Sequence, residues 1–416
     1  MRSIRDLALH NQTVFLRADL NVPLDKQQHI TDDARIKAVL PTIEYIIQKG
    51  GKIVLTSHLG RPKGKIVPTL RMEPVAKRLK ELLGQEIVYV DDCVGDMVKM
   101  AKEKLESGDV MLLENLRFYS QEEENDLHFA EQLVEGIDVY VSDAFGTIHR
   151  KHASTHALPS LIFDKGIGFL IEKEIEALDK IKKNPEQPLV LVIGGVKISD
   201  KVEIIRNLAP FCDVILVGGG VANTFLKGLG YDVGKSVVES DSVSKDQETV
   251  NYVEIAHELY DRFDAEKPTI HAKLPDGSLL HKIQLPLDVL AAPTMAPDAP
   301  VQMIDIVQGM NAHELMFLDI GPKTRELYCN VLRNAKTIFW NGPMGLFEVE
   351  AHAAGSRDVA ETIADSSGYA VTGGGDTESV VKKFGLKGRF SHASTGGGAS
   401  LKYLGSKKLP GLEALE

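Results

Sequence analysis

The segment Leu189-Val-Leu-Val-Ile-Gly-Gly-Val-Lys-Ile-Ser-Asp-Lys201 sets the fold class of this chain of 416 residues. Its first five residues form an unbroken apolar run, which is typical of a parallel strand buried on both faces of a sheet. Two glycines follow the run, and then a segment whose lysines are four residues apart, the spacing of one helix face. A strand, a glycine turn and a helix in this order indicate a βαβ unit.

The same alternation extends in both directions from this segment. Short Val-, Ile- and Leu-rich runs predict strands at 14–20, 52–57, 87–90, 110–114, 139–142, 189–193, 214–217, 316–319, 337–340 and 369–372. Helical spacing predicts helices near 33–48, 73–83, 95–106, 124–135, 200–208, 322–333, 354–365 and 376–384. Both halves of the chain are therefore expected to contain βαβ units with parallel strands.

The two halves are joined by a segment of helical period. Residues 169–181 place apolar side chains along one helix face and end before Asn184-Pro185, which predicts a connecting helix between two lobes. Two segments fit the alternation less well. Residues 273–279 contain an Asp-Gly turn signal and predict a small hairpin, and the prolines at 293, 297 and 300 predict a loop.

Composition excludes several classes of protein. Apolar residues make up 43% and charged residues 26%, which is ordinary for a globular protein and not for a disordered or collagenous one. The longest strongly apolar stretch without a charge, Val214–Leu226, is shorter than the ~18 residues that a membrane span needs. The first residues contain no apolar signal core. Because Cys93, Cys212 and Cys329 are widely separated, we expect no disulfide framework and a reducing, cytoplasmic location.

The net charge of −11 argues against a general nucleic-acid binder, since binding to phosphate backbones needs a basic surface. The charge is uneven, however. Residues 1–100 contain 16 Lys and Arg against 12 Asp and Glu, whereas the remaining residues contain 32 against 47. Two explanations of this difference remain open: a small anionic ligand binds near the N-terminal part, or the composition varies by chance.

Glycine clusters are the most prominent feature of the second half: Gly194-Gly195, Gly218–Gly220, Gly373–Gly375 and Gly396–Gly398. The first three follow predicted strands, where glycine lets backbone amides approach phosphate oxygens. Four clusters favour a nucleotide pocket over tight turns alone. The segment from Gly230 to Ser236 is one residue too short for a Walker loop, and no Gly-x-Gly-x-x-Gly occurs. Lys235 is therefore interpreted as a structural or surface residue.

Three charged residues lie beside these glycines. Lys197 and Lys201 are four residues apart and are either cations facing a polyphosphate or solvated lysines of a helix. Asp376 follows Gly375 at a strand-to-helix junction, where a carboxylate either holds Mg²⁺ on a nucleotide or caps the helix. Two cations beside glycine amides favour a polyphosphate over solvated lysines, whereas position alone does not separate the two interpretations of Asp376.

The first half contains a different set of groups, several of them just beyond the ends of predicted strands. They are Arg17, Asp19, Asn21, Arg35, His58, Arg61, Glu114, Arg117, His149 and Arg150. Arginine binds carboxylate and phosphate in a bidentate manner, so five arginines converging on one crevice would form an anion site. A single arginine of this kind more often belongs to a surface salt bridge, and Asp19 is also compatible with a partner for Arg17.

Eight motifs spread over essentially the whole chain together resemble the phosphoglycerate kinase family. They are Val14-Phe-Leu-Arg-Ala-Asp-Leu-Asn-Val-Pro23, Ser57-His-Leu-Gly-Arg-Pro62, Leu113-Glu-Asn-Leu-Arg117, Asp143-Ala-Phe-Gly-Thr-Ile-His-Arg150, Gly194-Gly-Val-Lys197, Trp340-Asn-Gly-Pro-Met-Gly-Leu-Phe-Glu348, Gly373-Gly-Gly-Asp-Thr377 and Ser394-Thr-Gly-Gly-Gly-Ala-Ser400. Against the family pattern, residues 268–281 resemble an insertion.

The resemblance implies an α/β fold of two doubly wound, Rossmann-like lobes joined by a hinge helix, and a monomeric enzyme. The implied segments are 1–168 for a 3-phosphoglycerate lobe, 169–185 for the interlobe helix, 186–400 for a nucleotide lobe, and 401–416 for a tail that returns to the first lobe. The substrates implied are 3-phosphoglycerate or 1,3-bisphosphoglycerate with ADP or ATP and Mg²⁺, and no nucleic acid or membrane partner is expected.

The resemblance also implies roles for individual residues. The triose site would comprise Arg17, Asp19, Asn21, Arg35, His58, Arg61, Arg117 and Arg150. The nucleotide site would comprise Gly195, Lys197, Lys201, Gly219, Gly220, Asn341, Pro343, Leu346, Glu348, Gly373, Gly374, Gly375, Asp376 and Thr377. Asp376 would hold the metal, and the amides of Gly396 to Gly398 would meet phosphate.

The implied reaction is reversible phosphoryl transfer between 1,3-bisphosphoglycerate and ADP, which gives 3-phosphoglycerate and ATP. Because the acyl leaving group and the ADP nucleophile are anions near neutral pH, no general base is expected, and catalysis is positioning plus charge stabilisation. Arg35, Lys197, Gly375 and Gly398 are the expected catalytic groups, and the lobes are expected to close. The alternatives are a non-catalytic nucleotide-binding scaffold and another small-molecule kinase of this fold.

Overall fold

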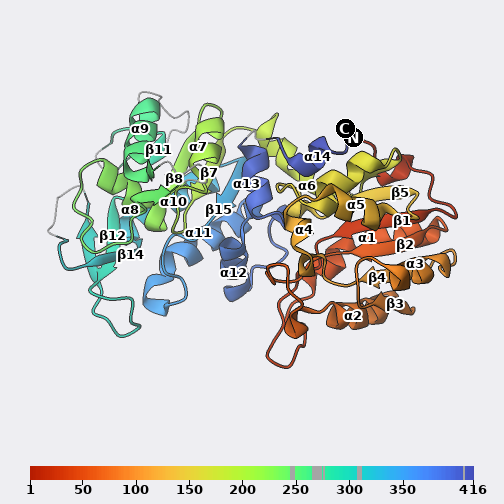
Figure 1. The fold of residues 1–416 in the computed structure, drawn as a ribbon. Helices are drawn as coiled ribbons and strands as arrows, with labels where there is room; N and C mark the ends of the chain where they lie inside the picture. Colours follow the sequence, from red (N-terminus) through yellow and green to blue (C-terminus); the bar gives the residue numbers. More distant parts are fainter. Residues whose placement is uncertain (244–248, 265–273, 275–276, 307–311, 406–407) are drawn as a thin grey trace. The chain divides into compact units, whose positions relative to one another are not determined.

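The computed structural model describes residues 1–243, 249–264, 274, 277–306, 312–405 and 408–416. The chain divides into two compact units, and Figure 1 shows their elements. Unit 1 comprises Met1–Glu176 and Lys408–Glu416, and unit 2 comprises Ala177–Lys407. In the described part of the chain, no helix is both long and apolar enough to cross a membrane.

Unit 1 contains a six-stranded parallel sheet in the order β3-β4-β2-β1-β5-β6. Its strands are β1 (Thr13–Ala18), β2 (Lys52–Thr56), β3 (Ile87–Val90), β4 (Val110–Leu113), β5 (Val139–Asp143) and β6 (Lys165–Ile167). Nearly every residue of β1, β2, β4 and β5 is buried, because helices cover both faces of the sheet. The five strands predicted in this half are confirmed, and β6 was not predicted.

Short connections and amphipathic helices complete unit 1. Its helices are α1 (Ala34–Gln48), α2 (Glu73–Leu83), α3 (Asp96–Glu103), α4 (Ser120–Glu123), α5 (Leu127–Val134), the first part of α6 (Phe169–Lys182) and α14 (Pro410–Glu413). In α2, Val75 and Leu79 face the core, and Gly84 ends the helix at φ +68° by donating its N–H to Lys80 O (2.9 Å).

The order of the strands in unit 1 fixes where a ligand can bind. The chain moves from β1 to one side of the sheet, and after β4 it crosses to β5 on the other side. In open α/β sheets, ligands bind outside the carboxyl ends of the strands at such a switch point. In unit 1 this point lies between Ala18 and Asp143, which are register partners at the ends of β1 and β5.

Unit 2 contains a second six-stranded parallel sheet, in the order β11-β8-β7-β15-β16-β17. Its strands are β7 (Leu189–Ile193), β8 (Val214–Val217), β11 (Ile283–Gln284), β15 (Thr337–Asn341), β16 (Tyr369–Gly373) and β17 (His392–Ser394). Counted along the chain, this is the 3-2-1-4-5-6 order of Rossmann folds, with the switch point between β7 and β15. The expectation of two doubly wound parallel sheets is confirmed.

The predicted strand at 316–319 exists, but its expected place in the parallel sheet is wrong. It forms β14 (Met316–Ile320), which pairs antiparallel with β12 (Asp288–Ala292), and β12 pairs antiparallel with β13 (Gln302–Asp305). The apolar run predicted a strand correctly, but an apolar run does not specify the partner strand. A two-stranded ribbon, β9 (Asp241–Val243) and β10 (Thr249–Asn251), is also present.

The helices of unit 2 follow its strands. They are the last part of α6, α7 (Val202–Leu208), α8 (Gly219–Gly228), α9 (Tyr252–Asp264), α10 (Pro322–Arg333), α11 (Ala354–Asp365), α12 (Gly375–Lys383) and α13 (Gly398–Leu404). The core of the unit packs around Trp340, which is fully buried and donates its indole N–H to Gly342 O (2.9 Å). The helices α8 and α9 were not predicted.

Three remaining expectations concern connecting segments. The proline-rich stretch 293–300 has no regular structure and joins β12 to β13, as predicted. The expected hairpin at 273–279 and the insertion at 268–281 lie only partly within the described residues, where Leu274 N donates to Ser278 O (2.9 Å). The segment expected as a tail, 401–416, is shared between the two units. Helix α13 continues to Leu404 within unit 2, and Lys408–Glu416 belongs to unit 1.

Two buried aspartates bind backbone N–H groups at helix N-termini. The Asp143 carboxylate accepts the N–H of Ile171 in the first turn of α6 (3.1 Å). The Asp319 carboxylate accepts the N–H groups of Gly355 in α11 (2.7 Å) and Ile320 (2.9 Å). Burial raises the pKa of each carboxyl to about 7, because it disfavours the charged form more than these N–H groups stabilise it.

These two carboxyls are expected to make the chain less stable as the pH rises from about 4 to about 7. Between these values an unfolded aspartate, with a pKa of about 3.9, has lost the proton that the folded chain keeps. Each group then contributes on the order of 1.4 kcal/mol of lost stability per pH unit. Carboxyl ¹³C NMR should give midpoints near pH 7 for both, and urea unfolding should measure the decline. Midpoints near pH 4 would contradict the prediction.

Candidate functional site

A cavity of about 370 Å³ lies at the carboxyl ends of the unit 2 strands. It is lined by residues that follow β7, β15, β16 and β17: Ser199, Asp200, Lys201, Glu203, Asn341, Gly342, Gly374, Gly375, Asp376, Thr377, Gly397, Gly398, Leu401 and Lys402. The cavity borders the switch point between β7 and β15, where this topology places ligands. Six of the predicted nucleotide-site residues line it, and so does Gly398.

The turn between β16 and α12 presents backbone amides to this cavity. Gly374 adopts φ +96° as the N-cap of α12, a conformation that favours glycine, and no side chain caps the helix. A Cβ built on Gly375 would meet no atom within 4 Å, so the space beside its Cα is open. Uncapped amides at a helix N-terminus suit a phosphate group.

Asn341 and Thr377 hold the two loops in place. The Asn341 side chain donates to Gly373 O (2.6 Å) and joins the end of β15 to the end of β16. The Thr377 hydroxyl donates to Gly373 O (2.8 Å) and accepts the N–H of Gly342 (2.8 Å). Both side chains are buried, so their hydrogen bonds shape the cavity from behind.

The charged side chains of the set differ in their surroundings. Lys201 is 9% exposed and lines the cavity. Burial lowers its pKa, although the negative charges of Asp200, Asp376 and Glu239 act in the opposite direction. Asp376 also lines the cavity and is exposed, and it makes no ion pair with any described residue. Lys197 lies in the same segment between β7 and α7 as Lys201, but it is exposed and does not line the cavity.

The glycines after β7 and β8 allow three backbone segments to pack closely. Gly195 N donates to Pro343 O (2.7 Å), and Gly219 N donates to Met344 O (2.9 Å). A Cβ on Gly219 would lie 2.9 Å from Gly195 O, and one on Gly220 would lie 2.8 Å from Val196 O. Close packing therefore accounts for glycine at these positions without any ligand.

The predicted adenine-slot residues do not line the cavity. Pro343 is buried and accepts the Gly195 N–H, Leu346 donates its N–H to Leu318 O (2.7 Å), and Glu348 is exposed. The structure thus brings six of the predicted nucleotide-site residues together at the cavity. The others lie outside its lining: Gly195, Lys197, Gly219, Gly220, Pro343, Leu346, Glu348 and Gly373.

A cluster of cations lies at the carboxyl ends of β1, β2 and β4 in unit 1. Arg35 Nη1 donates to Asp19 Oδ2 (2.8 Å), and Asp19 Oδ1 accepts the N–H of Asn21 (3.3 Å). Asn21 in turn accepts the N–H of Gly60 (2.9 Å), which joins the loop after β1 to the loop after β2. Asp19 is therefore paired with Arg35, and not with Arg17 as the adjacent positions suggested.

Arg17 and His58 lie beneath this cluster. Arg17 is fully buried, and its Nη2 lies 3.5 Å from His58 Nδ1. Burial, followed by the charges of Arg17, Arg117 and Arg35, holds the pKa of His58 well below its usual value. Sequence reasoning placed Arg17 among the ligand contacts, but in this structure no part of its side chain reaches the surface.

The other three predicted arginines differ in exposure. Arg117 is 3% exposed and donates to Gly60 O (2.9 Å), and burial lowers its pKa to about 10. Arg150 is half-buried and donates Nε–H to His149 Nε2 (3.2 Å). Arg61 is exposed and makes no ion pair or hydrogen bond through its side chain with a described residue.

Sequence reasoning missed a buried polar network behind these arginines. Glu122, which is fully buried, accepts the Ser154 hydroxyl (2.6 Å) and the Ser154 N–H (2.9 Å). His152 lies 3.8 Å from the same carboxylate, and burial lowers its pKa to about 3. Asn115 accepts the N–H groups of Leu59 and Arg117 (3.1 Å each). The one trace of this network in the sequence is Glu122, and because acidic residues follow it, the segment is typical of a surface helix.

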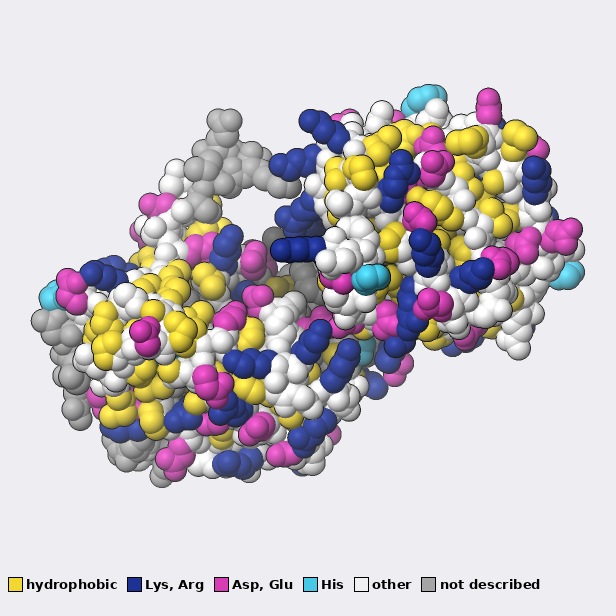
Figure 2. Space-filling model, turned by 90° about the horizontal axis from the view of Figure 1, so that it is seen from below, with side chains coloured by type: hydrophobic (Ala, Val, Ile, Leu, Met, Phe, Trp, Pro, Cys, Tyr) yellow, Lys and Arg dark blue, Asp and Glu magenta, His cyan; other side chains and the backbone are white. Residues whose placement is uncertain are grey.

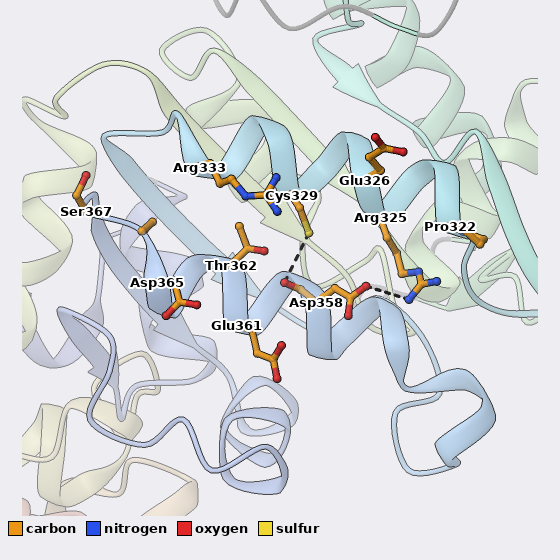
Figure 3. A pocket seen from close by; sticks show the side chains of 11 residues that line it. Pro322, Arg325, Glu326, Cys329, Arg333, Asp358, Glu361, Thr362, Asp365 and Ser367 are labelled. Carbon is orange, nitrogen blue, oxygen red and sulfur yellow. Dashed lines mark hydrogen bonds and ion pairs between the residues drawn. The ribbon is translucent and has the colours of Figure 1, made fainter.

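A larger cavity, of about 770 Å³, lies between α10 and α11 in unit 2 (Figure 3). Two of its charged side chains are in ion pairs with each other, Arg325 and Asp358 (2.9 Å), and Asp365 pairs with Arg389 outside the lining. The thiol of Cys329 donates to Asp358 O (3.6 Å), and burial raises its pKa. This groove contains no glycine loop from the end of a strand, and it is not the candidate site.

The surface charges agree with an anion site in unit 1. In the view of Figure 2, Lys and Arg side chains gather along one edge of unit 1, whereas both signs of charge are interspersed over the rest of the visible face. Local placement of charge therefore offsets the acidic total of −11.

Comparison with known proteins identifies the family. The family model described as phosphoglycerate kinase matches residues 4–407. Curated phosphoglycerate kinases from Moorella thermoacetica and Pelotomaculum thermopropionicum are 46% and 43% identical, over 99% and 100% of this chain and 98% of each relative. The solved phosphoglycerate kinase of Coxiella burnetii is 35% identical, with a TM-score of 0.83 over 100% of this chain and 98% of that one. With two doubly wound units and these similarities over nearly its whole length, the chain belongs to the phosphoglycerate kinase family.

Proposed function

We propose that this chain transfers a phosphoryl group reversibly between 1,3-bisphosphoglycerate and ADP, which gives 3-phosphoglycerate and ATP. The observation that carries the proposal is the cavity at the switch point of unit 2, which Lys201, Gly375 and Asp376 line together. The family membership of the chain supplies the identity of the substrates.

The cation cluster of unit 1 is proposed to bind the triose. Three of its arginines, Arg35, Arg61 and Arg150, have exposed or half-buried side chains that can reach a ligand. Asp19, Asn21, His58 and Arg117 are held in the same cluster by the contacts between the loops after β1, β2 and β4. Arginine matches both the carboxylate and the phosphate of 3-phosphoglycerate in a bidentate geometry.

The nucleotide is proposed to bind in unit 2, with its phosphates in the cavity. Lys201 is the buried cation of that cavity, and Gly375 and Gly398, whose amides are proposed to bind phosphate, line the same cavity. Lys197 is proposed to reach the phosphoryl group from the turn after β7. The slot formed by Gly195, Gly219, Gly220, Pro343, Leu346 and Glu348 is proposed for the adenosine part.

The residues of the cavity fit a magnesium ion on the nucleotide. Mg²⁺ prefers oxygen ligands and is often held by one or two carboxylates together with substrate phosphates and water. Asp376 is an exposed carboxylate on the cavity wall, beside the amides proposed for phosphate. When bound, the ion would neutralise charge on the phosphate oxygens.

The chain's own groups are proposed to act by position and charge. Both the carboxylate of 3-phosphoglycerate and the phosphate of ADP are ionised near neutral pH, so no residue needs to remove a proton. Arg35 and Lys197 are proposed to stabilise charge on the migrating phosphoryl oxygens, with the amides of Gly375 and Gly398. Since the two substrates are assigned to different units, α6, which contributes residues to both units, is the proposed hinge for closure. We expect a cytoplasmic monomer.

A coupled assay tests the function directly. The purified chain is mixed with 3-phosphoglycerate, ATP and Mg²⁺, and formation of 1,3-bisphosphoglycerate is followed through a dehydrogenase and NADH. We expect activity that depends on all three components. Nucleotide binding by calorimetry without any turnover would instead favour the non-catalytic scaffold.

Arg61→Ala is expected to raise KM for 3-phosphoglycerate about tenfold, since a charge-assisted hydrogen bond is worth about 1.5–3 kcal/mol. The KM for ATP should stay unchanged, because Arg61 belongs to unit 1 and the nucleotide cavity to unit 2. Steady-state kinetics with each substrate varied in turn measures both constants. Lys63→Ala, two residues along the same loop, is the matched control, and an unchanged KM for 3-phosphoglycerate in Arg61→Ala would remove Arg61 from the site.

A further inference from the structure

Each of the three nitrogens of the buried Arg17 guanidinium has a hydrogen-bond neighbour, and the side chain has no exposed surface. Its Nε donates to Ser154 Oγ (2.8 Å), and its Nη1 donates to the carbonyl of Ala18. The third nitrogen, Nη2, lies 3.5 Å from His58 Nδ1. Because the side chain is fully buried, whatever Arg17 contributes to the site must pass through a neighbour.

Ser154 and Glu122 fix the direction of Arg17. The Ser154 hydroxyl gives its proton to Glu122 (2.6 Å), which leaves its oxygen lone pairs for Arg17 Nε. Glu122 also accepts the Ser154 N–H (2.9 Å) and lies 3.9 Å from Arg17 Nη2. The guanidinium therefore has a single orientation, set by a carboxylate that is itself fully buried.

This orientation decides which nitrogen of His58 carries the proton. A guanidinium can only donate hydrogen bonds, so Nδ1 of His58 must be unprotonated in order to accept from Arg17. Asp19 Oδ1 competes for the same nitrogen from 4.0 Å and would favour a proton there. Asp19, however, already accepts from Arg35 (2.8 Å) and from the N–H of Asn21 (3.3 Å).

The other charges around His58 act in the same direction. The charged and titratable groups that face it are Arg17, Asp19, Arg35, Arg117 and His152. Cations outnumber the single carboxylate, and burial adds to their effect, so the ring stays neutral at physiological pH. Its other nitrogen, Nε2, has no hydrogen-bond partner among the described residues.

We propose that Arg17 is a positioning residue that fixes His58 with its proton on Nε2, so that His58 offers a neutral N–H donor to the anionic ligand of the unit 1 site. The identity of that ligand rests on the proposed function, whereas the state of the ring does not. A neutral donor binds a carboxylate or phosphate without changing its own charge between pH 5.5 and 8.

NMR of the ligand-free full chain with ¹⁵N-labelled histidine tests the state of the ring. The variant His58→Asn identifies the His58 signals among the 13 histidines. We expect a protonated Nε2 and an unprotonated Nδ1 at every pH from 5.5 to 8. A proton on Nδ1, or a doubly protonated ring at pH 7, would overturn the proposal.

Variants of Arg17 and Ser154 test whether Arg17 causes this protonation state of the His58 ring. In Arg17→Met, the pKa of His58 should rise, because one of the cations that lower it is removed, and KM for 3-phosphoglycerate should depend more strongly on pH between 5.5 and 7.5 than in the wild type. Arg17→Lys, which retains a donor, should restore the Nε2–H form. Ser154→Ala weakens the same network without removing a buried charge. The control is Ser160→Ala, which removes a hydroxyl that donates to Ala157 O.

An unchanged His58 tautomer in both Arg17→Met and Ser154→Ala would show that Arg17 has no such role. The result is separable from the proposed function, because the NMR measurement needs no substrate. If the wild-type chain showed the expected ring but no transferase activity, the proposed function would fail while the positioning role of Arg17 remained.

Discussion

Lys197→Ala is expected to lower kcat by about 10²–10³-fold and to leave KM for 3-phosphoglycerate within about twofold. A cation that meets the phosphoryl oxygens as their charge redistributes stabilises the transition state more than the bound substrate, and removing one such group has an effect of this size. Lys197 is exposed and makes no ion pair or hydrogen bond through its side chain with any described residue, so its loss leaves no unpaired partner. Steady-state kinetics in both directions measures the change.

The control for this variant is Lys227→Ala, which removes an equally exposed lysine from the end of α8 in the same unit. It should retain wild-type kinetics, and both variants should have the same melting temperature as the parent. A kcat within about threefold of wild type would exclude Lys197 from the transition state. A raised KM for ATP with unchanged kcat would assign it to ground-state binding alone.

The framework of the fold was predictable because buried parallel strands are short and apolar. The runs at 189–193 and 214–217 match β7 and β8 residue for residue. Helix α8 was missed because it follows β8 within one apolar stretch, Val214–Leu226, where periodicity does not separate a buried helix from a strand. The antiparallel sheet was missed because pairing between β12 and β14 depends on contacts distant in sequence.

The candidate site was predictable where residues follow a strand directly, since topology alone brings such residues to one edge of the sheet. Asp19, His58 and Asp376 are examples. The role of Arg17 was not predictable, because a charged residue within a strand looks the same in the sequence whether it faces a ligand or a buried partner. Its partner Ser154 is 137 residues away, and only the folded chain places the two together.

Arg35→Ala is expected to have the second large effect, a loss of about 10³-fold in kcat/KM for 3-phosphoglycerate. The variant removes the cation proposed to stabilise the phosphoryl oxygens, and it also leaves Asp19, which is 9% exposed, without its ion partner. An unpaired carboxylate in an anion site repels the substrate, so the loss should exceed that of Arg61→Ala. Steady-state kinetics with 3-phosphoglycerate varied at saturating ATP measures the change.

Three variants separate these causes. Arg35→Lys should recover only part of the activity, because a lysine is a point charge and cannot bind an anion with the guanidinium fork. Asp19→Asn combined with Arg35→Ala removes the unpaired carboxylate, and any activity it regains over Arg35→Ala measures that repulsion. The control is Arg2→Ala, which breaks an Arg–Asp pair of similar length in unit 1 (2.7 Å, to Asp164) and should retain wild-type kinetics. If Arg35→Ala changed only KM, with kcat intact, Arg35 would bind the triose without stabilising the transfer.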